Sequence, residues 1–529
     1  MSERNETYDY VIVGAGAAGC VLANRLTEHS DDRVLLLEAG SPDDRREISV
    51  PAGYAELLQS SVDWEYYTTP QPNLDDRSLY WPRGKTYGGS TSINAMIFVR
   101  GAPTDYDHWE SLGNDGWGWE DVQPYYERLE HFEGGPAIGR GTDGPLNIAE
   151  EVPYPHELSE AFMASCDTVS IPHADGFNNG QREGVSLYEV TQKDRERHSV
   201  ADAYLKPALT RSTLEARTEC KVTRIRFDGT RAVGVTYEHD GDRINVDVEK
   251  EVIVCAGAIE SPKLLLLSGI GPSDQLQTHG IDVVTDSPGV GRNLQDHLSY
   301  RVNWRLTEPI SFAGADNLWN LVKYLLLKRG PFTSNGVETG AFLRTDPDLP
   351  APDVRINFSP VLFLDHPPDP DDHGMHMTVS QQRPKSRGEI TLQSADPDDD
   401  PNIDPNYLDH EDDLSVLVAG IKRAREIARA EPLDAYCGEE LLPGPDAETD
   451  AEIAERIREN ALTDYHPVGT CKMGDGEFAV VDDRLRVRGV DDLRVVDASI
   501  MPTIDGGNPM ATTVMIAEKA SDFIRGKTP

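Results

Sequence analysis

The feature that most constrains this chain lies within its first forty residues. An apolar, β-branched run at 8–13 (YDYVIV) leads directly into three glycines with the spacing GxGxxG: Gly14, Gly16 and Gly19. A helical stretch follows, and a second apolar run at 34–37 ends in Glu38. This order predicts a strand, a glycine-rich turn, a helix and a parallel strand, which together form the βαβ unit of a doubly wound, Rossmann-like domain.

The glycine spacing has a chemical meaning in such a unit. Gly14 permits the tight turn, Gly16 lets the backbone approach a pyrophosphate, and Gly19 allows the helix to pack closely on the strand. The helix N-terminus then faces the diphosphate. Glu38, at the end of the second strand, is placed to bond ribose hydroxyls and would repel a 2′-phosphate, which disfavours NADP. The motif by itself does not separate FAD from NAD.

The rest of the chain predicts two kinds of sheet. Further buried elements of the first domain are predicted at both ends of the chain: strands at 252–255 and 493–497, and helices at 262–267 and about 509–523. Between residues 300 and 460 the pattern changes to alternating stretches separated by Asp/Pro-rich turns such as 365–372 and 396–405, with a helix near 412–429. The alternating stretches lie at 354–358, 377–380 and 389–392. We therefore expect a doubly wound α/β domain interrupted by an α+β insertion on an antiparallel sheet.

Composition narrows the environment and the partners. The 529 residues carry a net charge of −42, with 92 acidic against 50 basic residues. This charge makes nucleic acid and anionic membrane surfaces poor partners, and the excess of acid resembles proteins of salt-loving organisms. No apolar run is long enough to span a bilayer, and no signal peptide is visible. Six cysteines without CxxC spacing indicate free thiols in a reducing, cytoplasmic compartment.

Metal binding is not expected. His373 and His376 lie beside Asp371 and Asp372, but a solvated acidic loop explains this cluster better than a metal site.

Four long blocks closely resemble the glucose–methanol–choline (GMC) family of flavoprotein oxidoreductases. They are GKTYGGSTSINAMIFVRG at 84–101, GAIESPKLLLLSGIG at 257–271, DYHPVGTCKMG at 464–474 and MPTIDGGNPMATTVMIAEKASDFI at 501–524. Shorter blocks such as VGRNLQDH extend the resemblance over essentially the whole chain. Tyr87 is a mild departure, because the family usually has an aliphatic residue there.

The resemblance implies FAD bound in an extended form, with its ring between two domains. The FAD-binding domain would comprise 1–155, 199–300 and 463–529, and the substrate-binding domain 156–198 and 301–462. The residues implied for cofactor binding are Gly14, Gly16, Gly19, Glu38, Gly88, Gly89, Ser90, Asn94, Ala95, Val222, Asp497, Ala498, Asn508, Pro509 and Met510. Ile93 stands where some relatives carry a histidine that attaches FAD covalently, so non-covalent binding is expected.

The catalytic expectation centres on His466. Oxidation of an alcohol moves a hydride to flavin N5 and a proton to a base, and histidine has an ordinary pKa suited to that task. His466 matches the family's active-site histidine, and Asn508 matches its second catalytic position. Asn508 followed by Pro509 is also a good helix N-cap, so a structural role competes with the catalytic one. Tyr465 is expected to line the substrate cavity, while Glu338 either orients His466 or meets substrate, or is a structural carboxylate.

The resemblance predicts oxidation of a primary alcohol to the aldehyde. Choline and neutral aliphatic or aromatic alcohols are both candidates. Choline would need an aromatic cage and a carboxylate, and the aromatic candidates are Trp64, Trp319, Phe363 and Tyr465. The alternatives are a hydroxynitrile lyase on the same fold, without net redox, and a NAD-dependent dehydrogenase. The electron acceptor (O2, a quinone or a carrier protein) stays open.

Overall fold

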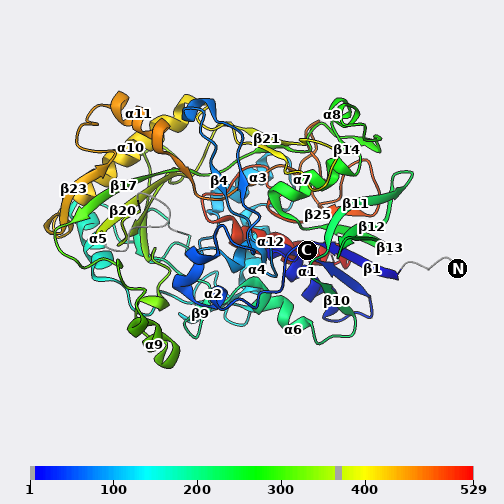
Figure 1. Ribbon diagram of the computed structural model, residues 1–529, viewed down its shortest axis with the longest axis horizontal. Helices are drawn as coiled ribbons and strands as arrows, with labels where there is room; N and C mark the ends of the chain where they lie inside the picture. Colours follow the sequence, from blue (N-terminus) through cyan, green and yellow to red (C-terminus); the bar gives the residue numbers. More distant parts are fainter. Residues whose placement is uncertain (1–5, 181, 364–371, 528–529) are drawn as a thin grey trace.

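The computed structural model describes residues 6–180, 182–363 and 372–527. Two seven-stranded sheets lie side by side along the long axis of the molecule (Figure 1). The sheet around β1 and β13 is on the right of this view, and the sheet around β17 and β20 is on the left.

The first sheet is mainly parallel and carries the predicted βαβ unit. Its strands follow the order β10, β2, β1, β13, β12 and β11, and β25 also pairs with β13. The bounds are β10 (Leu214–Arg217), β2 (Val34–Leu37), β1 (Glu6–Val13), β13 (Asp242–Val254), β12 (Arg231–His239), β11 (Lys221–Asp228) and β25 (Leu493–Val495). Strands β10, β2, β1, β13 and β25 run parallel, whereas β11 and β12 form antiparallel pairs beside the first part of β13.

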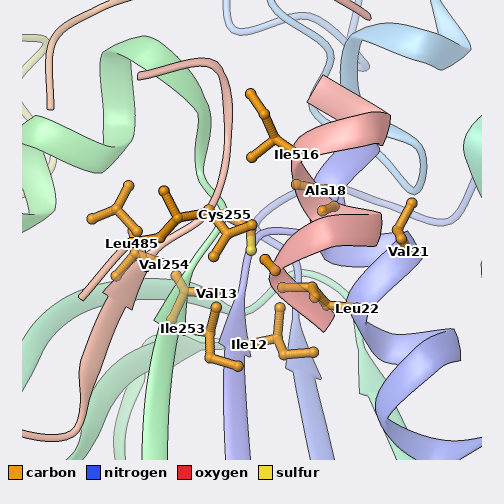
Figure 2. Close-up of a cluster of buried hydrophobic side chains, with 14 of the residues drawn as sticks. Ile12, Val13, Ala18, Val21, Leu22, Ile253, Val254, Cys255, Leu485 and Ile516 are labelled. Carbon is orange, nitrogen blue, oxygen red and sulfur yellow. The ribbon is translucent and has the colours of Figure 1, made fainter. Parts of the chain in front are cut away.

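Apolar side chains explain how the parallel strands and their helices hold together. Strand β2 is buried at every position because helices cover its sheet. Figure 2 shows the core between these elements, where side chains of β1 and β13 meet those of α1 (Ala17–Thr27) and α12 (Pro509–Ile524). The labelled members include Ile12, Val13, Leu22, Ile253 and Ile516. Helices α1 and α12 are therefore both packed on the first sheet.

The second sheet is antiparallel, as the alternating pattern predicts. Its order is β23, β17, β20, β19, β18 and β7, and β24 also pairs with β17. The bounds are β23 (Cys437–Leu442), β17 (Leu298–Leu306), β20 (Gly374–Gln381), β19 (Val354–Ser359), β18 (Thr339–Leu343), β7 (Gly184–Leu187) and β24 (Leu462–Thr463). Helix α10 (Glu411–Ala428) packs on β17, β19 and β20, and α5 (Glu157–Thr168) packs on β7 and β19.

One strand lies outside the sheet where the alternating pattern suggested it. Residues 389–392 overlap β21 (Gly388–Thr391), which joins a separate three-stranded sheet with β16 (Arg292–Leu294) and β22 (Asn402–Asp404). Alternation reports a strand with one buried face, but it does not say which sheet the strand joins. Most of the predicted Asp/Pro-rich turn at 365–372 lies outside the described residues.

The remaining elements are short strands and the other helices. The other strands are β3 (Tyr66–Tyr67), β4 (Tyr80–Trp81), β5 (Glu130–Phe132), β6 (Leu146–Ile148), β8 (Gln192–Lys193), β9 (Glu196–Arg197), β14 (Ile270–Gly271) and β15 (Thr285–Asp286). The other α-helices are α2 (Arg46–Ser49), α3 (Pro103–Ser111), α4 (Trp119–Leu129), α6 (Lys206–Ala208), α7 (Gly257–Leu267), α8 (Ser273–Thr278), α9 (Leu318–Leu327) and α11 (Asp450–Asn460). All six cysteines are free thiols. None of the helices in the described part of the chain is both long and apolar enough to cross a bilayer.

Candidate active site

A cavity of about 1080 Å³ is lined by residues of both seven-stranded sheets. One end is lined by the glycine-rich turn after β1, Glu38 and Val222, and the other by His466 and side chains of the antiparallel sheet. Most of the predicted site residues line it: Gly14, Gly16, Glu38, Gly89, Ser90, Asn94, Ala95, Val222, Tyr465, His466, Asp497, Ala498, Asn508, Pro509 and Met510. Gly19, Gly88 and Glu338 are not among the lining residues.

The glycine-rich turn has the geometry that its spacing predicts. Gly14 has a φ of +97°, and a Cβ there would meet the carbonyl oxygen of Cys255 at 2.6 Å. At Gly19 a Cβ would stand 1.9 Å from the Gly14 carbonyl oxygen, so only glycine permits this close packing of helix on strand. Gly16, the N-cap residue of α1, faces the cavity instead. The first turn of α1 carries no acidic residue, which leaves its N-terminus suited to an anion.

Glu38 is buried at the same end of the cavity and supports the turn. Its two carboxylate oxygens accept hydrogen bonds from the backbone N–H groups of Ala15 (2.8 Å) and Gly40 (2.9 Å). Burial raises the pKa of Glu38 to about 7, against the opposing effect of these two hydrogen bonds. A carboxylate held in this way is still exposed to the cavity and can accept a further hydroxyl.

His466 is held from three sides at the opposite end. Its backbone N–H donates to Asp296 Oδ1 at 2.6 Å. Its ring Nδ1 lies 2.9 Å from Nδ1 of His297, and its Nε2 lies 3.2 Å from Nδ2 of Asn508. The second nitrogen of His297 lies 3.2 Å from the carbonyl oxygen of Gln382. These contacts form a continuous chain of hydrogen bonds that ends at the cavity.

The chain of contacts fixes which nitrogen of His466 carries its proton. The Gln382 carbonyl only accepts, so His297 carries its proton on Nε2 and its Nδ1 must accept. The Nδ1–H of His466 is therefore the donor to His297, and Nε2 of His466 carries no proton and can accept a hydrogen bond. The Asn508 amide nitrogen donates to this Nε2, while its oxygen accepts from Arg355 at 3.1 Å. An unprotonated Nε2 is what a general base needs.

The surroundings keep both histidines neutral. Burial, followed by the charge of Arg355, lowers the pKa of His297 to about 3. The pKa of His466 is lowered well below its usual 6.5, first by burial and then by His297, Arg355 and Arg83. His466 is therefore unprotonated at neutral pH.

The side chain of Asn508 does not cap helix α12. The residue occupies the N-cap position of α12, but its side chain makes no capping hydrogen bond. The amide instead lies between His466 and Arg355, whose guanidinium also binds Asp464 at 2.6 Å. The first turn of α12 has no acidic residue, and Pro509 and Met510 line the cavity. The positive end of this helix therefore bears on the site.

Tyr465 adopts a backbone conformation that is rare outside glycine, with a φ of +65°. Its N–H donates to Thr463 Oγ1 at 2.7 Å, and its carbonyl accepts from the Arg83 guanidinium. Such residues cluster at functional sites because the surrounding structure must hold them in place. Here the turn presents the adjacent His466 to the cavity, and the tyrosine itself lines the wall.

Glu338 has neither of the functional contacts considered for it. It is fully buried, and its oxygens accept hydrogen bonds from Ser334 Oγ (2.6 Å), Ser159 Oγ (2.8 Å) and the His156 N–H (2.6 Å). These bonds join the start of α5 to the segment before β18. The arrangement supports the structural alternative, because it is His297 that contacts the His466 ring.

Other predicted residues also have protein partners. The carboxylate of Asp497 accepts from the Gly257 and Ser499 N–H groups at 2.9 and 2.8 Å, so its side chain is already engaged. His373 bonds Ser311, and His376 bonds the Val361 carbonyl. Asp371 lies outside the described residues. In the described ranges no group of three potential ligands is arranged for a metal ion.

Several residues of the site were not singled out from the sequence. They are Asp296, His297, Arg355, Gln382 and Asp464. A signal existed for two of them, since Asp296 and His297 form a polar pair directly before the buried strand β17. The others lie in strands or at their ends, where sequence alone does not show which face meets the cavity.

Comparisons with known proteins show the family of this chain. Residues 8–299 and 384–517 match the N- and C-terminal family profiles described as GMC oxidoreductase. The chain is 44% identical to the mitochondrial choline dehydrogenase of Homo sapiens, over 99% of this chain and 91% of that protein. It is 42% identical to the alcohol dehydrogenase (acceptor) of Pseudomonas putida, over 98% and 95% respectively. The crystal structure of pyridoxine 4-oxidase from Mesorbium loti superposes with a TM-score of 0.90 at 32% identity, covering 99% and 100% of the two chains.

The fold and the site define a flavoprotein oxidoreductase, and the chain belongs to the GMC oxidoreductase family. It is an FAD-dependent enzyme that acts on CH–OH groups, which confirms the predicted fold class, cofactor and reaction. These relatives favour alcohol oxidation over the lyase alternative. The residues present fit FAD, because the glycine-rich turn and two helix N-termini without acidic residues line one elongated cavity.

Proposed function

We propose that His466 is the general base of a primary-alcohol oxidation and that Asn508 positions the substrate oxygen. The observation that carries the proposal is the hydrogen-bond chain from Gln382 through His297, which leaves Nε2 of His466 unprotonated beside the cavity. FAD, when bound, supplies the hydride acceptor. A substrate hydroxyl would replace the Asn508 N–H as the donor to Nε2 while the Asn508 amide donates to the substrate oxygen, and the proton would pass to His466 as the hydride leaves carbon.

The protein groups around the cavity support the cofactor assignment residue by residue. Gly16 and the N-terminus of α1 would receive the diphosphate, and Glu38 and Val222 would contact the adenosine end. The loop containing Gly89, Ser90, Asn94 and Ala95 would lie along the flavin, near the N-terminus of α12. That terminus would stabilise negative charge developing on the ring. The proposed FAD-binding segments remain 1–155, 199–300 and 463–529.

Anaerobic bleaching of the flavin near 450 nm by added alcohol tests the reaction type. An oxidoreductase is reduced by its substrate, whereas a lyase without net redox is not. A yellow protein that turns over a cyanohydrin without bleaching would overturn the assignment of the reaction.

The cavity favours an alcohol without a positive charge over choline. Arg301 lines the catalytic end, and its guanidinium carbon lies 4.0 Å from the centre of the Phe363 ring. The Trp64 ring similarly has the Lys85 ammonium 4.5 Å from its centre. Trp319 is 75% exposed on α9 and does not line the cavity, whereas the other three aromatic candidates, Trp64, Phe363 and Tyr465, do. Two of the candidate aromatic faces are thus already covered by the protein's own cations.

The charge of Arg301 opposes a quaternary ammonium. Among the described residues Arg301 has no ion pair, whereas Arg355 is neutralised by Asp464. A substrate cation held about 6 Å from a guanidinium is destabilised by roughly 3 kcal/mol at an effective dielectric constant of about 20. We therefore expect kcat/KM for 3,3-dimethylbutan-1-ol to exceed that for its charged isostere choline by at least about tenfold.

Two variants on strand β17 test whether Arg301 itself causes the preference for the neutral alcohol. Arg301→Met should narrow the preference for the neutral alcohol, while Arg305→Met should leave it unchanged. Arg305 is half-exposed and pairs with Asp372, so it controls for loss of an arginine on the same strand. A preference for choline in the unmodified enzyme would contradict the neutral-substrate proposal and leave the base assignment intact.

The remaining elements of the proposal concern the state of the protein. Buried Ile93 cannot form a bond to flavin, so acid precipitation should release all yellow colour to the supernatant. Colour retained in the pellet would contradict non-covalent binding. Free, mostly buried cysteines support a reducing cytoplasmic location, and the net charge of −42 supports a saline one. We also propose that segments 156–198 and 301–462 form the substrate-binding domain. The electron acceptor is O2, a quinone or a carrier protein.

A further inference from the structure

Helix α9 exposes its apolar side chains to solvent. It projects from the body of the protein at the lower left of Figure 1. Among the described residues its exposed large apolar side chains are Leu318, Trp319, Val322, Leu325, Leu326 and Leu327. Trp319 is 75% and Leu326 77% exposed. Contiguous exposed apolar side chains on a folded protein mark an interaction surface.

Five of these six exposed side chains share one face of the helix, and Leu327 lies outside that face. At about 100° per residue, positions 318, 319, 322, 325 and 326 fall within an arc of roughly 120°. Tyr324, on the opposite side, is buried. The usual orientation of an amphipathic helix is thus reversed, with the apolar face directed outward.

The local charge is opposite to that of the protein as a whole. Residues 317–337 contain no Asp or Glu but contain Lys323, Lys328 and Arg329, in a chain with 92 acidic residues. Lys328 pairs with Glu196. Within the described ranges Lys323 and Arg329 have no ion pair. A protruding helix with Trp and Leu on one face and free basic groups beside it is typical of a segment that lies in a membrane interface.

The helix is attached to the wall of the active-site cavity at both ends. Phe312 to Asp316 precede it, Pro331 and Phe332 follow it, and all of these residues line the cavity. Any surface to which α9 binds would therefore lie close to the wall of the active-site cavity. A reactant dissolved in lipid would then be concentrated next to the site.

We propose that α9 docks this enzyme on the surface of a lipid bilayer containing anionic lipids, at salt concentrations that screen the net charge of −42, with Trp319 and Leu326 buried among the acyl chains. Lys323 and Arg329 would lie at the level of the headgroups. A second copy of this chain fits less well, because a ten-residue helix is only about 15 Å long. A stable protein interface needs about 800 Å² from each partner.

Vesicle co-sedimentation of the FAD-loaded protein tests the proposal directly. The vesicles contain phosphatidylcholine with phosphatidylglycerol, and the buffer contains molar KCl so that long-range repulsion by the acidic body is screened. We expect the unmodified protein to sediment with the vesicles. The double variant Trp319→Gln/Leu326→Gln should lose at least about a hundredfold in partition coefficient, because two large apolar side chains no longer enter the bilayer.

A matched control tests whether loss of any exposed apolar side chain, rather than loss of those on α9, weakens vesicle binding. Ile138 is 96% exposed and lies outside α9, so Ile138→Gln should bind vesicles like the unmodified protein. Flavin absorbance and its bleaching by a water-soluble alcohol should be unchanged in both variants, which shows that folding and the active site are intact. Absence of vesicle binding by the unmodified protein, or full binding by the double variant, would overturn the proposal. If instead the variant only abolished dimers seen in sedimentation velocity, the face would be a contact with a second copy.

Discussion

Replacing His297 with phenylalanine should slow flavin reduction without removing any group that touches the substrate. The His466 Nδ1–H would lose its acceptor at 2.9 Å, the ring of the fully buried His297. Leaving a buried donor unsatisfied costs about 1–3 kcal/mol. His466 can avoid this cost by moving its proton to Nε2, where Asn508 and the substrate lie, and this tautomer is not a base. Because 1.36 kcal/mol corresponds to a factor of ten, we expect the reduction rate to fall roughly 5- to 150-fold.

Anaerobic stopped-flow measurement of the limiting reduction rate at saturating alcohol tests this prediction. The control is His198→Phe, since partly buried His198 accepts a hydrogen bond from the Asn147 N–H at 3.1 Å but does not line the cavity. That variant should reduce its flavin at the normal rate. An unchanged rate in His297→Phe, with FAD retained, would refute the argument that His297 fixes the tautomer of His466.

Three further predictions concern the Asn508 side chain, the pKa of His466 and the net charge of the protein. Because the Asn508 side chain makes no capping bond, Asn508→Ala should slow flavin reduction yet leave the melting temperature nearly unchanged; a loss of about 1 kcal/mol of stability would instead indicate a cap. Because burial lowers the pKa of His466 well below 6.5, the base stays unprotonated as pH falls through 6.5, and the limiting reduction rate should hold its plateau there; a decline with a midpoint near 6.5 would contradict this. Because salt screens the net charge of −42, the melting temperature should rise with KCl toward the molar range, and an unchanged value in dilute buffer would remove the halophile inference.

Local pattern was sufficient to predict much of the fold. The βαβ unit with Gly14 and Gly19 was predictable because its turn and helix packing leave no room for a Cβ. Helix α12 was predicted at about 509–523 and spans Pro509–Ile524, since Pro at the first turn and a buried apolar run mark such an element. The sheet to which β21 belongs was not predictable, because strand pairing depends on contacts between distant segments.

The active site shows the same division. His466 and Asn508 were identified from their motifs, and the structure places their side chains 3.2 Å apart. The role of His297 was missed because its contact with His466 spans 169 residues. Glu338 was singled out because it lies in a block that resembles the family. The sequence did not reveal that its carboxylate binds Ser159, Ser334 and the His156 backbone instead of His466. Motifs in the sequence thus singled out His466 and Asn508, whereas their contacts with His297 and Arg355 became visible only in the fold.

The most direct test of the central claim is the rate of flavin reduction in His466→Ala. The variant should fold and retain FAD, because the backbone contact of residue 466 with Asp296 is preserved. Under anaerobic conditions with saturating alcohol, its limiting rate of bleaching near 450 nm should fall by about 10²- to 10⁴-fold. A rate within a few-fold of the unmodified enzyme would show that His466 is not the base.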